Sequence, residues 1–488
     1  MNKPIRAMAI LCLVLFMGLL VNATYLQYVA ADGLNDDPRN RRVVVASFSR
    51  ERGAILVGRE PVAESVPSGD RYDFQRTYPE PFKYAHVTGF FSYYSQTGIE
   101  QTQNAILSGD DSRLFVDRVI DMIANAEPQG GNVQLTLDRA AQDAAHAGLS
   151  GLGEGTRAAV VAIEPPTGKV LAMASSPAYD PNLLAQHDLA QVAQAYDRLE
   201  GADAQPLLNR TTQTTLPPGS TFKLVTAAAA LESGNYDNAQ SMVPGGSSFQ
   251  LPQSTTTIGN HDGGNCGGNR ITLTQALQVS CNVTFLSLAD ELGTEAMQEQ
   301  AEEFGFNSTS LDGLPEQAES LYPGDMDPPQ TAMSGIGQSS VTASPLQMAM
   351  VASGIANGGS VMKPYLVDEV RTPELELLDK TEPTELSQAV SQDTARELTK
   401  ALVATVDSGT ATPAQIPGVD VAGKTGTAQS APDRPPYAWF VSFAPATNPE
   451  VAVAVMVESA NVGRDEIAGG RLGGPIAKSV MEAVLNRD

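Results

Sequence analysis

An uncharged apolar run near the N-terminus constrains this chain of 488 residues more than any other feature. Residues 7–21 are uncharged and largely apolar, and the stretch without charge continues to about residue 31. A helix rises about 1.5 Å per residue, so the run is long enough to span a bilayer. Lys3 and Arg6 precede it, which predicts a cytoplasmic N-terminus and an exported chain beyond the run.

A cleaved signal peptide is the alternative, because Val21 and Ala23 flank Asn22 in a loose cleavage pattern. We favour an uncleaved anchor, since Tyr25 and Tyr28 extend the run with an aromatic edge typical of a membrane interface. In both cases the rest of the chain enters an oxidising compartment without ATP. With the anchor retained, we expect a single-pass plasma-membrane protein whose catalytic domain is extracytoplasmic.

Composition excludes two classes of partner. Lys and Arg total 31 against 56 Asp and Glu, which gives a net charge of −25. Such a chain repels phosphate backbones, so nucleic acid is not expected to bind. The three cysteines and four histidines show no spacing typical of a metal site, and we expect neither a metal nor a cofactor.

The exported chain changes its pattern part-way along. Residues 43–129 alternate short apolar segments with turn residues, as in a small strand-rich domain. Strand patterns then recur at both ends of the second half, with helical sequence between them, which predicts one sheet built from distant segments and covered by a helical insert. The predicted division is 1–31 for a cytoplasmic stub and anchor, 32–147 for a non-catalytic pedestal, and 148–488 for the catalytic domain.

The strands expected in the second half lie in two pairs, each joined by a turn. They cover residues 158–163, 170–174, 438–443 and 451–457. A final helix is expected from about residue 475 to 485.

Ser220 and Lys223 form the first chemical constellation. Pro217 and Pro218 favour a helix start, and the Ala-rich sequence after Lys223 is a strong helix former with almost no polar face. Ser220 would then lie in the first turn, where backbone N–H groups stabilise an oxyanion. A buried Lys223 would have a lowered pKa and could accept the Ser220 proton. The pair alone decides nothing, because a helix-capping serine explains it equally simply.

Ser280 and Asn282 form a second pair at an expected junction between two helices. If the backbone turns there, Ser280 could relay a proton and Asn282 could bind a substrate amide. A capping pair is the alternative, and we regard the glycosylation sequon that begins at Asn282 as coincidence.

Residues 424–427 carry the third group, Lys-Thr-Gly-Thr. Residues 418–425 also satisfy the P-loop pattern for nucleotide phosphates. That interpretation needs a helix after Lys424, but the following sequence is rich in proline and ATP is lacking outside the membrane. As a strand, the segment would let an extended peptide approach closely at Gly426, with Lys424 and Thr427 binding a terminal carboxylate.

In this order and spacing, the three groups resemble those of penicillin-binding proteins and serine β-lactamases. Further segments resemble class B penicillin-binding proteins, and the length with one short-tailed anchor is similar to the actinobacterial A type of that class. These segments are 52–55, 98–100, 135–138, 335–338, 342–345 and 438–441. Cys281 and Ser442 depart from the family pattern, and neither departure removes a catalytic group.

The resemblance implies an α/β (α+β) fold of the serine β-lactamase/transpeptidase type with an antiparallel central sheet. It implies a peptidoglycan cross-linking D,D-transpeptidase that acts through a serine acyl-enzyme on D-alanyl-D-alanine stem peptides and binds β-lactams covalently. The oxyanion hole would be formed by the backbone N–H groups of Ser220 and Thr427. A SEDS-family membrane glycosyltransferase is the expected protein partner. The implied site residues are Ser220, Lys223 and Ser280 for catalysis, and Asn282, Lys424, Thr425, Gly426 and Thr427 for substrate binding.

Three alternatives stay open at this point. A D-alanyl-D-alanine carboxypeptidase differs only in using water as the acceptor. A class A β-lactamase adds a Glu-x-x-Leu-Asn loop, and the nearest segment, 316–321, lacks its Asn. A β-lactam sensor needs a cytoplasmic domain, whereas about six residues precede the apolar run.

Cys266 and Cys281 are the exported thiols, since Cys12 lies in the apolar run. They would close a short Gly-rich loop beside Ser280. A disulfide that stiffens the cleft wall and a pair of free thiols are equal alternatives.

Overall fold

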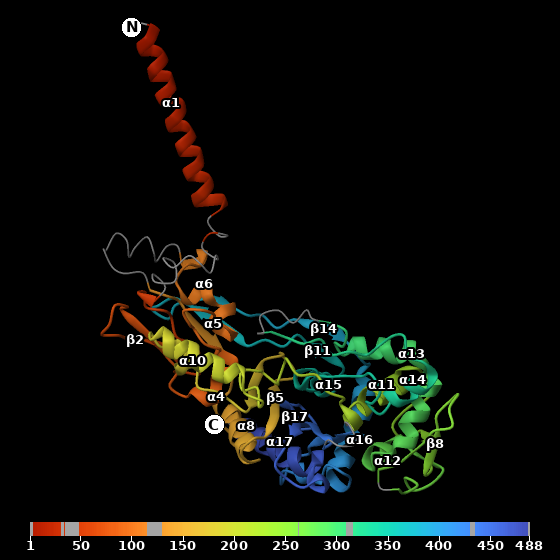
Figure 1. The fold of residues 1–488 in the computed structure, drawn as a ribbon. Coiled ribbons are helices and arrows are strands. Elements are labelled where there is room, and N and C mark those ends of the chain that lie inside the picture. Colours follow the sequence, from red (N-terminus) through yellow and green to blue (C-terminus); the bar gives the residue numbers. More distant parts are fainter. Residues whose placement is uncertain are drawn as a thin grey trace.

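The computed structural model describes residues 3–30, 34, 48–114, 129–261, 263–308, 316–429 and 435–486. Helix α1 (Lys3–Thr24) continues into a π-helical turn (Tyr25–Val29) and stands apart from the other elements in Figure 1. An 18-residue window within the segment Lys3–Val29 has a mean hydropathy of 2.4, and none of the segment is buried against the protein. The helix is therefore long and apolar enough to cross a membrane, as the sequence predicted.

A five-stranded antiparallel sheet forms the centre of the second half of the chain, in the order β15-β16-β17-β5-β6. The pairing of β17 with β5 joins the C-terminal strands to the first strand pair. This confirms the prediction of one sheet built from distant segments. The strands are β5 (Arg157–Ile163), β6 (Val170–Ser176), β15 (Ala422–Ala428), β16 (Tyr437–Ala444) and β17 (Val451–Ser459).

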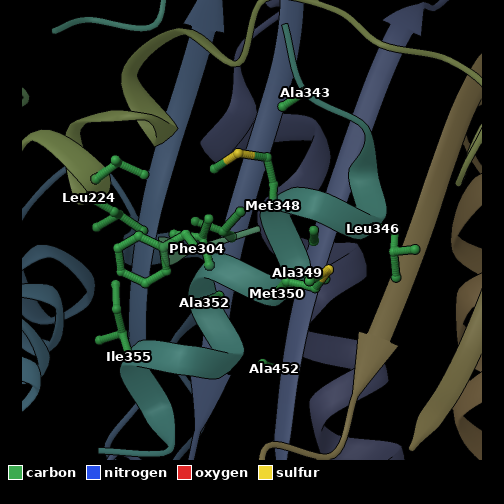
Figure 2. Close-up of a cluster of buried hydrophobic side chains, with 14 of the residues drawn as sticks. Leu224, Phe304, Ala343, Leu346, Met348, Ala349, Met350, Ala352, Ile355 and Ala452 are labelled. Carbon is green, nitrogen blue, oxygen red and sulfur yellow. The ribbon is translucent and has the colours of Figure 1, made fainter. Parts of the chain in front are cut away.

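Helices cover both faces of this sheet, which explains why β5, β6, β16 and β17 are apolar at most positions. Successive residues of a strand point to opposite faces. Val453 and Val455 of β17 pack in one cluster with α8 (Arg139–Ser150) and α17 (Gly469–Leu485). Ala452 packs in another cluster with α15 (Pro345–Ala356), as Figure 2 shows.

The segment between β6 and β15 contains the predicted helical insert. Helix α11 is buried from Lys223 to Leu231, as its lack of a polar face predicted. The helices are α9 (Asn182–Ala185), α10 (Leu189–Glu200), α11 (Lys223–Glu232), α12 (Leu273–Gln278), α13 (Asn282–Glu303), α14 (Pro328–Ser334), α15 and α16 (Gln392–Ser408). Three two-stranded ribbons accompany them: β7 (Met242–Pro244) with β10 (Arg270–Thr272), β8 (Ser248–Gln250) with β9 (Thr257–Gly259), and β11 (Ser360–Met362) with β14 (Glu385–Gln388).

A second, six-stranded mixed sheet has the order β13-β12-β4-β1-β2-β3. The sequence predicted a contiguous pedestal over 32–147, and the sheet also takes in two strands from the second half of the chain (Figure 1). The strand pattern at 43–47 lies outside the described residues. The strands are β1 (Ile55–Val57), β2 (Glu60–Pro67), β3 (Phe74–Thr77), β4 (Asn132–Leu135), β12 (Val367–Arg371) and β13 (Leu377–Lys380), and the helices beside them are α4 (Pro81–Thr88), α5 (Gly98–Thr102) and α6 (Asn104–Leu107).

Three buried charged side chains tie these elements together. Glu100 of α5 accepts hydrogen bonds at 2.6 Å from Nε of Arg52, just before β1, and from Nε of Arg76 on β3. The Tyr78 hydroxyl also donates to Glu100, at 3.3 Å. Burial alone would raise the pKa of Glu100, but the two guanidinium groups outweigh it and lower the pKa overall.

Candidate active site

Ser220 lies in a short 3-10 helix, Gly219–Thr221, and α11 begins only at Lys223. The sequence predicted Ser220 in the first turn of the α-helix itself, so the prediction was one turn off. The reason is Gly219, which has a φ of +56° and donates its N–H to the carbonyl of Gly337 at 3.0 Å. A Cβ at Gly219 would stand 3.0 Å from the Cβ of Ala428, so the serine turn packs directly on strand β15.

Lys223 is fully buried at the start of α11. Its Nζ donates to the backbone carbonyl of Ser280 and to Oδ1 of Asn282, both at 2.8 Å. Burial, and then the charge of the nearby Lys424, lower the pKa of Lys223 well below its ordinary value. A neutral amine has two N–H donors and one lone pair, so these two bonds leave the lone pair available for a proton.

Lys424 is also fully buried, in the middle of β15. Its Nζ donates to Oγ of Ser280 at 2.9 Å and to the carbonyl of Thr425 at 3.0 Å. Burial lowers the pKa of Lys424 to about 7. The Ser280 hydroxyl oxygen also accepts a longer contact from Nζ of Lys223, at 3.3 Å, so it bridges the two lysines.

Ser280 lies between α12 and α13, at the predicted junction of two helices, and has a left-handed φ of 57°. Asn282 is the first residue of α13, and its Nδ2 donates to the carbonyl of Gly259 at 3.1 Å. Between them, Cys281 forms a disulfide with Cys266. The structure thus selects one of the two alternatives that the sequence left open for these cysteines.

Residues 424–427 lie in strand β15 at one end of the sheet order. A Cβ at Gly426 would stand 2.9 Å from the carbonyl oxygen of Pro218, so the close packing of the strand on the serine turn requires glycine there. Thr425 and Thr427 are partly exposed. A strand in place of a helix after Lys424 contradicts the P-loop interpretation.

The structure therefore brings the three motifs together at one place. Lys223, Ser280, Asn282 and Lys424 are joined by hydrogen bonds, and Ser220 adjoins them through the packing of its turn on β15. Within the described ranges, no group of three or more His, Cys, Asp or Glu side chains is placed to hold a metal ion.

Sequence reasoning missed Asn260, whose Oδ1 accepts hydrogen bonds from the backbone N–H groups of Asn282 at 2.9 Å and Val283 at 3.2 Å. An isolated asparagine in a Gly-rich stretch has the appearance of an ordinary turn residue. No local signal in the sequence could have identified it.

Comparison with known proteins matches residues 158–482 to the penicillin binding protein transpeptidase domain. The chain belongs to the penicillin-binding protein family. A second match, to the penicillin binding protein A dimerisation domain, covers residues 52–133. These matches confirm the family and the fold that the motifs predicted.

This penicillin-binding protein is similar over its whole length to proteins named peptidoglycan D,D-transpeptidase PbpA. The relative from Mycolicibacterium smegmatis is 43% identical, and that from Mycobacterium tuberculosis strain H37Rv is 42% identical; each alignment covers 99% of both chains. Solved structures of penicillin-binding protein A from M. tuberculosis are also similar. The ceftriaxone acyl-enzyme has a TM-score of 0.85 at 40% identity and covers 91% of this chain and 100% of its own. The penicillin G acyl-enzyme has a TM-score of 0.83 at 41% identity and covers 90% and 100%.

Proposed function

We propose that this penicillin-binding protein is a peptidoglycan D,D-transpeptidase in which Ser220 is the nucleophile and Lys223 its general base. The observation that carries the proposal is the buried Lys223 amine, whose pKa is lowered and whose two donors are already occupied. A serine hydroxyl becomes a strong nucleophile only when an adjacent base takes its proton. The transpeptidase activity named for the full-length relatives supports the same reaction class.

In the acylation step, Oγ of Ser220 attacks the penultimate carbonyl of a D-alanyl-D-alanine stem, and its proton moves to Nζ of Lys223. The backbone N–H groups of Ser220 and Thr427 stabilise the tetrahedral oxyanion. The peptide bond to the terminal D-alanine then breaks. Ser280, which bridges both lysines, returns the proton to the leaving amine, and the acyl group stays on Ser220 as an ester.

Substrate binding uses strand β15 and the start of α13. Lys424, Thr425 and Thr427 hold the terminal carboxylate, and Gly426 lets the extended peptide lie against the strand. The carboxylate also keeps Lys424 charged, because a nearby negative charge raises the pKa that burial has lowered. The carboxamide of Asn282 binds an amide of the stem. An amine from a neighbouring stem then attacks the ester carbonyl and gives its proton to Lys223. The new amide bond forms as the ester bond to Ser220 breaks, and Lys223 returns the proton to Oγ of Ser220.

We also propose the placement of the molecule. Lys3 and Arg6 lie at the cytoplasmic end of α1, and everything beyond Val29 is extracytoplasmic. The predicted division at residue 147 holds only approximately: the pedestal also includes β12 and β13, and α8 packs on the catalytic sheet. A SEDS-family glycosyltransferase, which makes the glycan strands that carry the stems, is the proposed membrane partner.

Labelled penicillin tests the nucleophile. The full-length protein in detergent is incubated with the label, chased, and digested with trypsin. Label is expected on the peptide 211–223, which holds Ser220, and is expected to stay there for many minutes because the tethered leaving group blocks the acceptor amine. Rapid turnover would mean a β-lactamase, and no label at all would contradict the proposal.

A synthetic donor stem incubated with an acceptor amine tests whether the acyl group passes to an amine or to water. Cross-linked dimer is expected as the main product. Hydrolysed acid without dimer would mean a carboxypeptidase.

A further inference from the structure

Helix α13 begins beside the active site without a cap of its own. The first N–H groups of a helix need acceptors from outside the helix, usually a Ser, Thr, Asp or Asn side chain at the preceding residue. Here that residue is Cys281, which makes no capping hydrogen bond and is bonded to Cys266. The first helical side chain, Asn282, is already committed to Lys223 and to the carbonyl of Gly259.

Asn260 supplies the missing cap from a different part of the chain. Its Oδ1 accepts from the N–H groups of Asn282 and Val283, at 2.9 and 3.2 Å. Its Nδ2 donates to the carbonyls of Gly246 and Gly264, both at 2.8 Å. Every partner matches this orientation of the amide, because a flipped amide would set donor against donor and acceptor against acceptor.

The cap bears directly on the conformation of Ser280. A non-glycine residue at a φ of 57° is strained and persists only where its surroundings fix it. On one side, the N–H of Ser280 donates to the carbonyl of Leu277 at 3.1 Å. On the other side, the backbone of Asn282 is held by Asn260.

We infer that Asn260 is a positioning residue: its side-chain oxygen caps α13 and so holds Ser280 and Asn282 against Lys223. The inference rests on the proposed function, since Ser280 and Asn282 act in that reaction. Asn260 itself touches backbone atoms and not the substrate. The disulfide at Cys281 is a separate tether of the same loop, so the loop stays attached when Asn260 is changed.

The test measures acylation of the full-length protein by a fluorescent penicillin, with the rate constant of acylation separated from the dissociation constant of the initial complex. Asn260→Ala is expected to lower the rate constant by about 10- to 100-fold, because displaced catalytic groups lose alignment. Asn260→Asp keeps an acceptor for both N–H groups and adds a charge that a helix N-terminus favours, but its second oxygen faces the carbonyls of Gly246 and Gly264 in place of a donor. It should therefore acylate more slowly than wild type by no more than about tenfold.

Asn307→Ala is the matched control. Asn307 likewise accepts from a backbone N–H, that of Tyr322 at 2.8 Å, and donates to its carbonyl at 2.9 Å, but it takes no part in the motifs. It should lower the melting temperature as Asn260→Ala does and leave acylation unchanged. Ser220→Ala should abolish labelling, which separates failure of the proposed function from failure of the cap.

Three results would overturn the inference while Ser220→Ala remains inactive. Asn260→Ala could acylate at the wild-type rate, or Asn307→Ala could lose as much rate as Asn260→Ala. In the third, the rate constant of acylation of Asn260→Asp falls more than about tenfold while its melting temperature is unchanged. This third result would overturn the inference even if Asn260→Ala does not fold.

Discussion

Replacing Glu100 by Gln removes the one negative charge between two buried guanidinium groups. Glu100 is shielded from water and ions, since its side chain has 0% exposure. The side chains of Arg52 and Arg76 are almost as deeply buried. The substitution keeps the size of the side chain. It therefore isolates the charge from the packing of the sheet that β1 and β3 belong to.

The expected loss follows from the geometry. Each carboxylate oxygen of Glu100 accepts a hydrogen bond at 2.6 Å from a guanidinium nitrogen. Glutamine keeps one of these acceptors and puts an NH₂ donor in place of the other, so that one guanidinium faces a donor. Removing one partner of a buried ion pair costs about 3–5 kcal/mol. With an m-value of about 3 kcal/mol/M, the urea midpoint falls by about 1–1.7 M.

Urea titration by circular dichroism measures this shift, with Glu60→Gln as the matched control. Glu60 also pairs with an arginine, Arg139, at 2.7 Å, but both side chains are exposed, so the control should lose no more than about 1 kcal/mol. Equal midpoints for the two variants would refute the reasoning.

The pH dependence of the Glu100 effect has a definite sign. The pKa of Glu100 is below its ordinary value of 4.5 in the folded protein. The stabilisation is therefore complete above pH 4.5 and is lost as the pH falls through the lowered pKa. The difference between wild type and Glu100→Gln should narrow in acid.

Further predictions concern the site. Lys223→Ala should lower acylation by penicillin by at least about 100-fold in a stopped-flow assay, and normal acylation would assign the base elsewhere. Lys424→Ala should weaken donors that carry a terminal carboxylate more than carboxylate-free donors, and equal losses would contradict its role. In a pH profile, the acylation rate should rise as the pH passes the lowered pKa of Lys223, because the amine becomes neutral. The affinity for donors with a terminal carboxylate should decline above about pH 7, where Lys424 of the free protein loses its charge. Intact-mass measurement should show Cys266 and Cys281 alkylated only after reduction, and two thiols that react without reduction would exclude the bond.

Sequence patterns predicted four strands of the catalytic sheet well, because both faces of the sheet are buried and β5, β6, β16 and β17 are mostly apolar. The strand pairs at β5–β6 and β16–β17 fall within one or two residues of their predicted ends. Helix α17 begins at Gly469, earlier than expected. The sequence did not predict this start, because the first turns contain four glycines and a proline, which disfavour a helix. Packing against β16, where Gly473 lies close to Phe440, overrides that preference.

The identities of the site residues could be predicted from the sequence, but the backbone conformation that positions them could not. Ser220, Lys223 and the other motif residues stand at fixed spacings along the chain. The 3-10 turn at Ser220, however, depends on a contact of Gly219 with Gly337, more than a hundred residues away. The left-handed Ser280 and the cap from Asn260 likewise depend on tertiary neighbours that no local pattern encodes.

The six-stranded sheet has a consequence for the order in which an exported chain can fold. Strand β4 lies between β1, on its N-terminal side in sequence, and β12, which belongs to the second half. If the chain leaves the membrane from its N-terminal end, β4 emerges long before β12 and keeps an open edge of hydrogen-bonding groups meanwhile. In that case the six-stranded sheet would close only after β12 had emerged, and a fragment that stops after β4 would retain an edge able to pair with other nascent chains.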